Sequence, residues 1–280
     1  VFPRMLALSE VVWSDPAQRD FLDFARRLPW HLDRLDAQGI RYRIPDVVGL
    51  ERDHLTLDDH MKVRLEAPVH GTIHYTVDDS EPGAASPVYR EPLDLDVEHR
   101  PMTVRALMVL PDGRVGHEAS ATFSRTTPQP AALVDVPMEP GLNVDVFEGD
   151  LIRRAADIEE RGTFDHRDRV DEIAVPRWAT GDTAALRFRA YLAVPEDDVY
   201  TFGLRTSGGA LLRFGGAVVL DADSPGRPRD AVGQVALAKG LHPVEVLYFG
   251  SGEGGSLELR MARGDGRLEP VPQGALLRIR

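Results

Sequence analysis

Pairs of adjacent carboxylates are the residues of this chain whose type and spacing could support acid–base chemistry. They occur at Asp58-Asp59, Asp78-Asp79, Glu159-Glu160 and Asp197-Asp198. Two neighbouring carboxyl groups can share a proton or divide the roles of acid and orienting group when one of them ends a buried strand. Each pair here falls in a predicted turn or charged loop, where aspartate is common because it accepts nearby backbone hydrogen bonds. We therefore interpret all four pairs as solvated residues and assign no catalytic residue.

His70 and His74 have the four-residue spacing of metal ligands on a helix. Gly71 and Thr72 between them predict the start of a strand instead, and no third ligand is close in sequence. The pattern favours a structural histidine. The sequence indicates no metal site and no cofactor.

Tryptophans and a pair of turn aspartates are the candidates for contact with a ligand. Trp13 and Trp30 lie on predicted apolar helix faces, which favours core packing. Trp178 stands in an irregular stretch after a proline and stays open as an aromatic platform for a sugar. Asp221 and Asp223 follow a predicted strand and offer oxygens, although two turn aspartates more often solvate a loop. Our predicted ligand-binding residues are Trp178, Asp221 and Asp223.

The first segment of the chain, residues 1–44, has the period of helices. The first helix repeats its apolar residues at Phe2, Met5, Leu8 and Val12, with Leu6 and Trp13 beside them. A second helix carries Phe21, Phe24, Leu28, Leu32 and Leu35 on one face. Pro29 should kink or divide it, and Gly39 should end it. Because no earlier element of the chain can cover the first apolar stripe, we expect its partner to be encoded upstream.

The second and third segments, residues 45–127 and 128–280, have the alternation of strands. Alternating runs occupy residues 61–65, 72–77 and 103–109 in the second, and 185–192, 199–204, 210–214, 244–249 and 257–261 in the third. Residues 110–114 predict a hairpin turn, in which Pro111 sets the first corner and Gly113 supplies a positive φ. Residues 150–172 are charged and irregular, and we predict a long surface loop there.

The composition excludes several classes of partner. A net charge of −12 over 280 residues repels phosphate backbones, so we expect no nucleic acid partner. No apolar run is long enough to span a bilayer, so we expect no membrane partner. The absence of cysteine rules out disulfides and thiolate chemistry and leaves the compartment unknown.

Three stretches resemble consecutive parts of glycoside hydrolase family 20, the β-N-acetylhexosaminidases. FPRMLALSEVVWS at residues 2–14 resembles the helix that ends the family's (β/α)8 barrel. IHYTVDDSEP at 73–82, with SPVY at 86–89 and PL at 92–93, resembles the chitobiase/hexosaminidase C-terminal sandwich, which usually has Gly where Asp79 stands. VP at 194–195, VYTF at 199–202 and GLHPVEVLYF at 240–249 resemble the protective-antigen-type sandwich often appended to such enzymes.

The resemblance implies a mainly β chain with a helical remnant of a barrel at its N-terminus. Residues 1–44 would be the terminal barrel helices, 45–127 a small Ig-like β-sandwich and 128–280 a larger protective-antigen-like β-sandwich. The implied parent is a retaining exo-hydrolase of terminal N-acetylhexosamine, in which the acetamido oxygen of the substrate attacks the anomeric carbon. The family's Asp-Glu pair lies before the last barrel helix, so catalytic residues are expected upstream of Val1 and this chain alone is expected to be inactive.

The partners implied by the resemblance are glycans that contain N-acetylhexosamine, reached through the parent enzyme. An extracellular or periplasmic location rests on the family alone. The alternative is a non-catalytic carbohydrate-binding or structural accessory protein, since lectin-like relatives of the last sandwich hold glycan through calcium on adjacent aspartates. The corresponding stretch here, Ser207-Gly208-Gly209-Ala210, has no carboxylate, and Gly215-Gly216 follows where Asp-Gly is common. This favours scaffolding over sugar binding for that module.

Overall fold

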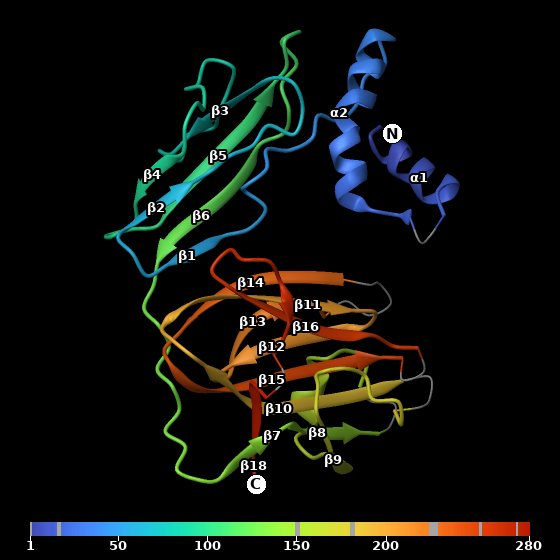
Figure 1. Ribbon diagram of the computed structural model, residues 1–280, viewed down its shortest axis with the longest axis vertical. Helices are drawn as coiled ribbons and strands as arrows, with labels where there is room; N and C mark the ends of the chain where they lie inside the picture. Colours follow the sequence, from blue (N-terminus) through green and yellow to red (C-terminus); the bar gives the residue numbers. More distant parts are fainter. Residues whose placement is uncertain are drawn as a thin grey trace. The chain divides into compact units, whose positions relative to one another are not determined.

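The computed structural model describes residues 2–15, 18–148, 152–179, 183–223, 229–251, 254–272 and 274–280. The chain divides into two compact units (Figure 1). Unit 1 comprises Val1–His54 and Asp58–Arg125, and unit 2 comprises Leu55–Leu57 and Thr126–Arg280. The mainly β class with a helical N-terminus, predicted from the change of period after residue 44, is confirmed.

Unit 1 begins with the helices α1 (Arg4–Trp13) and α2 (Phe21–Ala37). The expected division at Pro29 does not occur, and α2 is continuous through it. A proline costs the helix one backbone hydrogen bond, and buried Leu32 and Leu35 hold the following turns against the core of unit 1. Gly39 ends the helical segment as predicted, with φ of 68°.

The apolar stripe of α1 is only partly covered within the described residues. Phe2 and Leu6 pack against the core of unit 1, whereas Met5 and Leu8 are exposed. The side chains of Trp13 and of Trp30 in α2 are 88% and 77% exposed. The prediction that these two tryptophans pack in a core is therefore wrong for this structure, because helical period identifies an apolar residue but not the partner that buries it.

The β part of unit 1 contains short antiparallel strands. They are β1 (His54–Thr56), β2 (His60–Val63), β3 (Thr72–Thr76), β4 (Leu93–Asp96), β5 (Met102–Val109) and β6 (Ala119–Arg125). One sheet has the order β1-β6-β5-β3, and β2 pairs with β4 separately. The predicted turn at 110–114 is confirmed, since the Gly113 amide donates to the Leu110 carbonyl at 2.9 Å and Gly113 has φ of 83°.

Unit 2 has an eight-stranded sheet and a four-stranded sheet. Its strands are β7 (Met138–Pro140), β8 (Leu142–Phe147), β9 (His166–Val170), β10 (Ala184–Val194), β11 (Asp198–Thr206), β12 (Gly209–Phe214), β13 (Ala217–Asp221), β14 (Arg229–Leu237), β15 (Gly240–Gly250), β16 (Leu257–Arg263), β17 (Glu269–Pro270) and β18 (Leu276–Ile279). The larger sheet has the path β13-β12-β15-β10-β18-β7, with β8 and β9 joined through β10. The smaller has the order β14-β11-β16-β17.

Alternating side chains from both sheets form the core of unit 2. Leu186 and Phe188 of β10 pack in one cluster with Phe202 and Leu204 of β11, and all four are fully buried. The five strands predicted from alternation in this segment are all present. The residues between the core positions of β10 point to the opposite face of the sheet, because successive side chains of a strand alternate.

We predicted a surface loop at residues 150–172, of which the structure describes residues 152–172. For these described residues the prediction is wrong. The segment contains helix α3 (Asp157–Arg161) and strand β9, which pairs with β8. Ile152, Ala155 and Ile158 are buried in a small cluster on the outer face of the larger sheet. Their three-residue spacing was hidden in the sequence by the acidic and basic residues around them.

Among the described residues, no helix combines the length and the apolar character that a membrane span needs.

Candidate functional site

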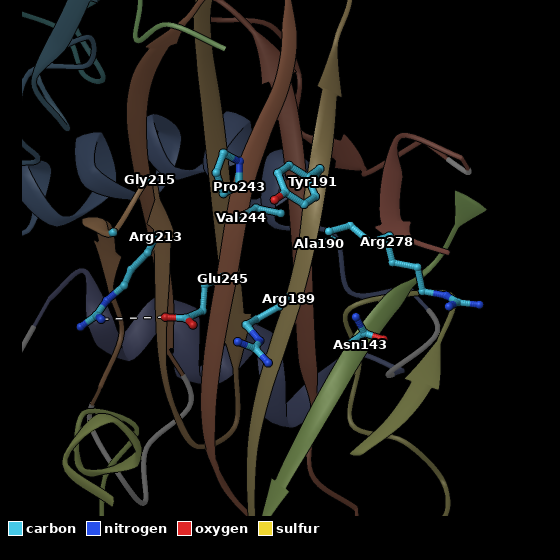
Figure 2. Close-up of a pocket in the computed structure, with 12 residues that line it drawn as sticks. Asn143, Arg189, Ala190, Tyr191, Arg213, Gly215, Pro243, Val244, Glu245 and Arg278 are labelled. Atoms are coloured by element: carbon cyan, nitrogen blue, oxygen red, sulfur yellow. Dashed lines mark ion pairs between the residues drawn. The ribbon is translucent and has the colours of Figure 1, made fainter. Parts of the chain in front are cut away.

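A hollow of about 530 Å³ lies on the larger sheet of unit 2 (Figure 2). The polar side chains that line it come from four neighbouring strands and from β18: Asn143, Arg189, Tyr191, Arg213, Glu245 and Arg278. On β10 the lining residues Arg189 and Tyr191 alternate with the core residues Phe188 and Leu192. The hollow therefore lies on the face of the sheet that points away from the core.

Strand register places four of these residues in one row across the sheet. Arg213 of β12 is opposite Glu245 of β15, and Glu245 is opposite Arg189 of β10. Arg189 is in turn opposite Asn143 of β8. Side chains directly opposite one another on one face have Cβ atoms about 4.5–5.5 Å apart. Residues separated by up to 102 positions in sequence thus form one continuous polar row (Asn143 to Glu245).

Tyr191 contributes an aromatic ring to the hollow from the same face of β10 as Arg189. Tyr191 lies two positions after Arg189 and opposite Pro243 of β15. Figure 2 shows the Tyr191 and Pro243 rings beside one another above the polar row. Among the described residues, no hydrogen bond involves the Tyr191 hydroxyl or the Asn143 side-chain amide. The hollow combines a ring face with polar groups available to a ligand, the usual composition of a small-molecule site.

A second row of the same face holds Asp145, a fully buried carboxylate. Arg167 Nε donates to its Oδ1 at 2.5 Å, and Arg187 donates to Oδ2 from Nη2 at 2.8 Å and from Nε at 3.0 Å. Arg189 from the polar row also reaches Oδ2, with Nη2 at 2.9 Å. Burial acts to raise the pKa of Asp145, but the hydrogen bonds from Arg167 and Arg187 outweigh it, so this pKa lies below its usual value.

The other arginines of the hollow have their own acidic partners. Arg213 pairs with Glu159 of α3 and more distantly with Glu245, at 3.9 Å. Arg278 of β18 pairs with Glu139 of β7. Arg189 differs from both, because its only described partner is a carboxylate already held by two other arginines. The hollow is therefore rich in hydrogen-bond donors and has its positive charge concentrated beside Arg189.

The predicted ligand-binding residues lie outside this hollow. Trp178 is 41% exposed, and its ring centroid lies 6.3 Å from that of His166. Asp223 accepts from the backbone amides of Ala155 and Ala156, at 2.9 and 3.0 Å, one on each carboxylate oxygen. Within the described ranges, no hydrogen bond or ion pair joins Trp178 to either aspartate.

Asp221 and Asp223 act on the local backbone. Asp221 accepts from the Asp223 amide at 2.9 Å and is exposed, as expected of a turn aspartate. The Asp223 carboxylate lies so close to Gly209 that a Cβ at position 209 would collide with it. Asp223 therefore joins the loop after β13 to the segment that leads into α3, and both of its oxygens are used within the protein.

The paired carboxylates support turns and ion pairs. Asp78 accepts from the Ser80 amide and hydroxyl, and Asp79 is left-handed with φ of 64°. Asp59 pairs with Arg125, Asp197 accepts from the Lys239 amide, and Asp198 pairs with Arg263. Glu159 departs from the prediction, because it lies in α3 and pairs with Arg213.

The interpretation of His74 as a structural histidine of a strand is confirmed. His74 is buried in β3, with Nδ1 2.9 Å from the Ser86 carbonyl oxygen and Nε2 3.0 Å from Thr72 Oγ1. Across the described part of the chain, no three or more histidine, aspartate or glutamate side chains gather in a way that could hold a metal.

The polar row that contains Arg213, Glu245, Arg189 and Asn143 was not predicted from the sequence. The sequence signal that could have found it is Arg187-Phe188-Arg189-Ala190-Tyr191, in which polar residues alternate with apolar ones along one strand. That alternation predicts a strand but does not identify the residues of other strands that lie beside its outward side chains. Only the register shows that they meet Asn143 and Asp145 of β8 and Glu245 of β15.

Two family models match parts of the chain. The PA14 domain model matches residues 152–274, which lie in unit 2. The Fn3 associated family matches residues 63–123 of unit 1. These matches cover most strands of both units and leave the N-terminal helices and the strands β1, β7, β8 and β18 outside.

Similar proteins include an enzyme and two sugar-related domains. A β-hexosaminidase of Porphyromonas gingivalis is 27% identical over 270 residues, which is 91% of this chain and 33% of that protein. A PA14 sugar-binding domain from an RTX adhesin covers 47% of this chain and 94% of its own, with 14% identity and a TM-score of 0.38. The Epithelial Adhesin 9 A domain of Candida glabrata covers 55% and 97%, with 11% identity and a TM-score of 0.44. The chain thus spans about a third of the length of the curated enzyme it resembles.

Proposed function

We propose that this chain is the C-terminal region of a β-N-acetylhexosaminidase, a retaining, substrate-assisted exo-hydrolase of terminal N-acetylhexosamine. The observation that carries the proposal is the 27% identity to a β-hexosaminidase over 91% of this chain. In this proposal α1 and α2 close the catalytic barrel. The β modules follow as a chitobiase/hexosaminidase C-terminal sandwich, residues 45–127, and a protective-antigen-like sandwich, residues 128–280.

The exposed side chains of α1 support this proposal. Met5, Leu8 and Trp13 are apolar, exposed and on one helix, which is an unusual concentration for a surface helix. A barrel helix buries such residues against the barrel strands and the neighbouring helices. The catalytic pair would then belong to the barrel, and this chain would supply closure and accessory modules without a catalytic residue.

The test is hydrolysis of a chromogenic N-acetyl-β-D-glucosaminide. We expect no turnover by the 280 residues alone and turnover by the same chain extended upstream through its reading frame. The control is the extended protein with the acidic pair of its barrel changed to amides, which should be inactive. Turnover by the 280 residues, or an upstream sequence without a barrel, would contradict the proposal.

The second candidate function is non-catalytic carbohydrate binding by unit 2, favoured by its PA14 domain. This candidate uses Trp178 as a platform and Asp221 and Asp223 as oxygen ligands. Asp221 has an exposed carboxylate, but Asp223 has both oxygens engaged by backbone amides. Sugar binding that disappears on chelation of calcium, and on Asp221→Ala, would support this form. Binding that survives both would exclude it.

A further inference from the structure

We propose that the hollow on the outer face of the larger sheet binds the carboxylate of an acidic saccharide without a metal ion. It uses none of Trp178, Asp221 and Asp223, the residues of the calcium-dependent candidate described above. It also stands apart from the hydrolase proposal, because it concerns binding by unit 2 alone. Either proposal can fail while the other holds.

The main donor is Arg189. Its guanidinium has one described partner, Asp145 Oδ2 at 2.9 Å, and its side chain is 42% exposed. A guanidinium carries five N–H donors in a fixed planar fork, which matches the two oxygens of a carboxylate. One engaged Nη2 leaves donors of Arg189 for a ligand in the hollow, and Figure 2 shows that guanidinium at the hollow below Glu245.

Charge favours an anion at this place. Arg167, Arg187 and Arg189 surround the single carboxylate of Asp145, and Glu245 stands opposite Arg189, so three positive charges less two negative charges leave a surplus of one. The chain as a whole has a net charge of −12 and repels anions. A local excess of positive charge on such an acidic chain makes this position favourable for an anionic group.

The other lining groups suit a sugar rather than a simple ion. The hollow, at about 530 Å³, is far larger than a carboxylate and lies within the range of about 300–1,000 Å³ for ligand pockets. The Tyr191 ring offers a flat apolar face to the C–H groups of a pyranose. Asn143 can donate to and accept from hydroxyl groups, and Glu245 can accept from them.

A divalent cation does not fit the same hollow. Glu245 is the only carboxylate among its lining residues, and arginine side chains stand on both sides of it in the row. Calcium requires six to eight oxygen ligands. Binding here should therefore persist in excess chelator.

The experiment compares two tetrasaccharides that share N-acetylglucosamine and differ in charge. A hyaluronan tetrasaccharide alternates glucuronate with N-acetylglucosamine, and chitotetraose is neutral. We expect titration calorimetry of the 280-residue chain in EDTA to show binding of the first and at least about tenfold weaker binding of the second, as charge-assisted hydrogen bonds predict. No binding of hyaluronan tetrasaccharide, or equal binding of both, would overturn the proposal.

Variants locate the site. Arg189→Gln keeps a donor for Asp145 and removes the charge, so it should weaken hyaluronan binding about tenfold or more. Glu245→Gln removes a negative charge beside the ligand and should leave binding equal or tighter. Arg205→Ala is the matched control, since Arg205 is an exposed arginine of β11 in the other sheet. Its loss should not change binding.

Asn143→Ala tests the same position without touching the Asp145 cluster. It should weaken binding while the thermal midpoint stays that of the parent chain, which separates a lost ligand contact from a lost fold. Unchanged hyaluronan binding in both Arg189→Gln and Asn143→Ala would overturn the assignment to this hollow.

Discussion

The carboxylate of Asp145 lies 2.8 Å from Arg187 Nη2 on the outer face of the larger sheet, between β8 and β10. Asp145 is fully buried, and Arg187 stands on the neighbouring strand directly opposite it. Arg167 and Arg189 complete a cage around the same carboxylate. Because β8, β9 and β10 each contribute one member or more, this cluster ties the strands together through side chains as well as through backbone hydrogen bonds.

Replacement of Asp145 should strongly destabilise unit 2. Asp145→Asn keeps the shape but leaves three guanidinium groups without their shared anion. Breaking a buried ion pair from one side costs about 3–5 kcal/mol, and the partial exposure of the arginines places the expected loss near the lower end. Urea unfolding measures it. Asp230→Asn is the control, since Asp230 pairs at 3.5 Å and 4.0 Å on an exposed surface and should lose no more than about 0.5 kcal/mol.

The native protein should lose its greater stability over the Asp145→Asn variant in acid. The pKa of Asp145 lies below its usual value in the folded protein. A lowered folded pKa gives stability that is present above the unfolded pKa of about 4 and is lost as the pH falls through the folded value. The difference in free energy of unfolding between the two proteins should therefore be constant from pH 7 to about 5 and shrink below about 4. A difference that grows on acidification would show that Asp145 does not hold the charge assigned to it.

Replacement of Asp223 should lower the stability of the fold, and this role of Asp223 should not depend on a bound metal ion. Both of its oxygens accept backbone amides of Ala155 and Ala156, so Asp223→Ala leaves two donors of a partly buried segment without partners. Lost caps of this kind cost about 1–2 kcal/mol. EDTA should leave the thermal midpoint of the native chain unchanged. Asp221→Ala is the comparison, because it removes one exposed bond and should cost less. A thermal midpoint that falls in EDTA would instead indicate that this loop binds a cation.

Strands and turns could be predicted from the sequence because both depend on the pattern of neighbouring residues. The alternation at residues 185–192 and the turn at 110–114 each depend on contacts a few positions away, and both are confirmed. The row from Arg213 to Asn143 depends on register between strands far apart in sequence, and the burial of Ile158 in α3 depends on side chains of those strands. Nothing local distinguishes Arg189, which lines a hollow, from Arg205, which is exposed on another sheet.

Asp79 should tolerate glycine and reject a branched residue. It has φ of 64° in the turn after β3, a region that aspartate reaches at modest cost and β-branched residues reach at high cost. We expect Asp79→Gly to change the free energy of unfolding of unit 1 by less than about 1 kcal/mol and Asp79→Val to lower it by about 1–3 kcal/mol. Glu81→Val, at an exposed position in the same loop, controls for the added apolar surface. Equal losses in all three would show that the turn is not set by this φ.

The exposed residues of α1 should matter only when an upstream partner is present. Leu8→Gln with Trp13→Gln changes side chains that are exposed in this chain, so its free energy of unfolding should stay within about 0.5 kcal/mol. Leu32→Ala in α2 is the matched contrast, because Leu32 is fully buried and its truncation should cost about 2–5 kcal/mol. In the upstream-extended protein the double variant should lower the thermal midpoint and the yield of active enzyme, since the same side chains would then be buried against the barrel. If it leaves the extended protein as stable as the parent, α1 does not close a barrel, and the accessory modules must attach to the enzyme by another surface.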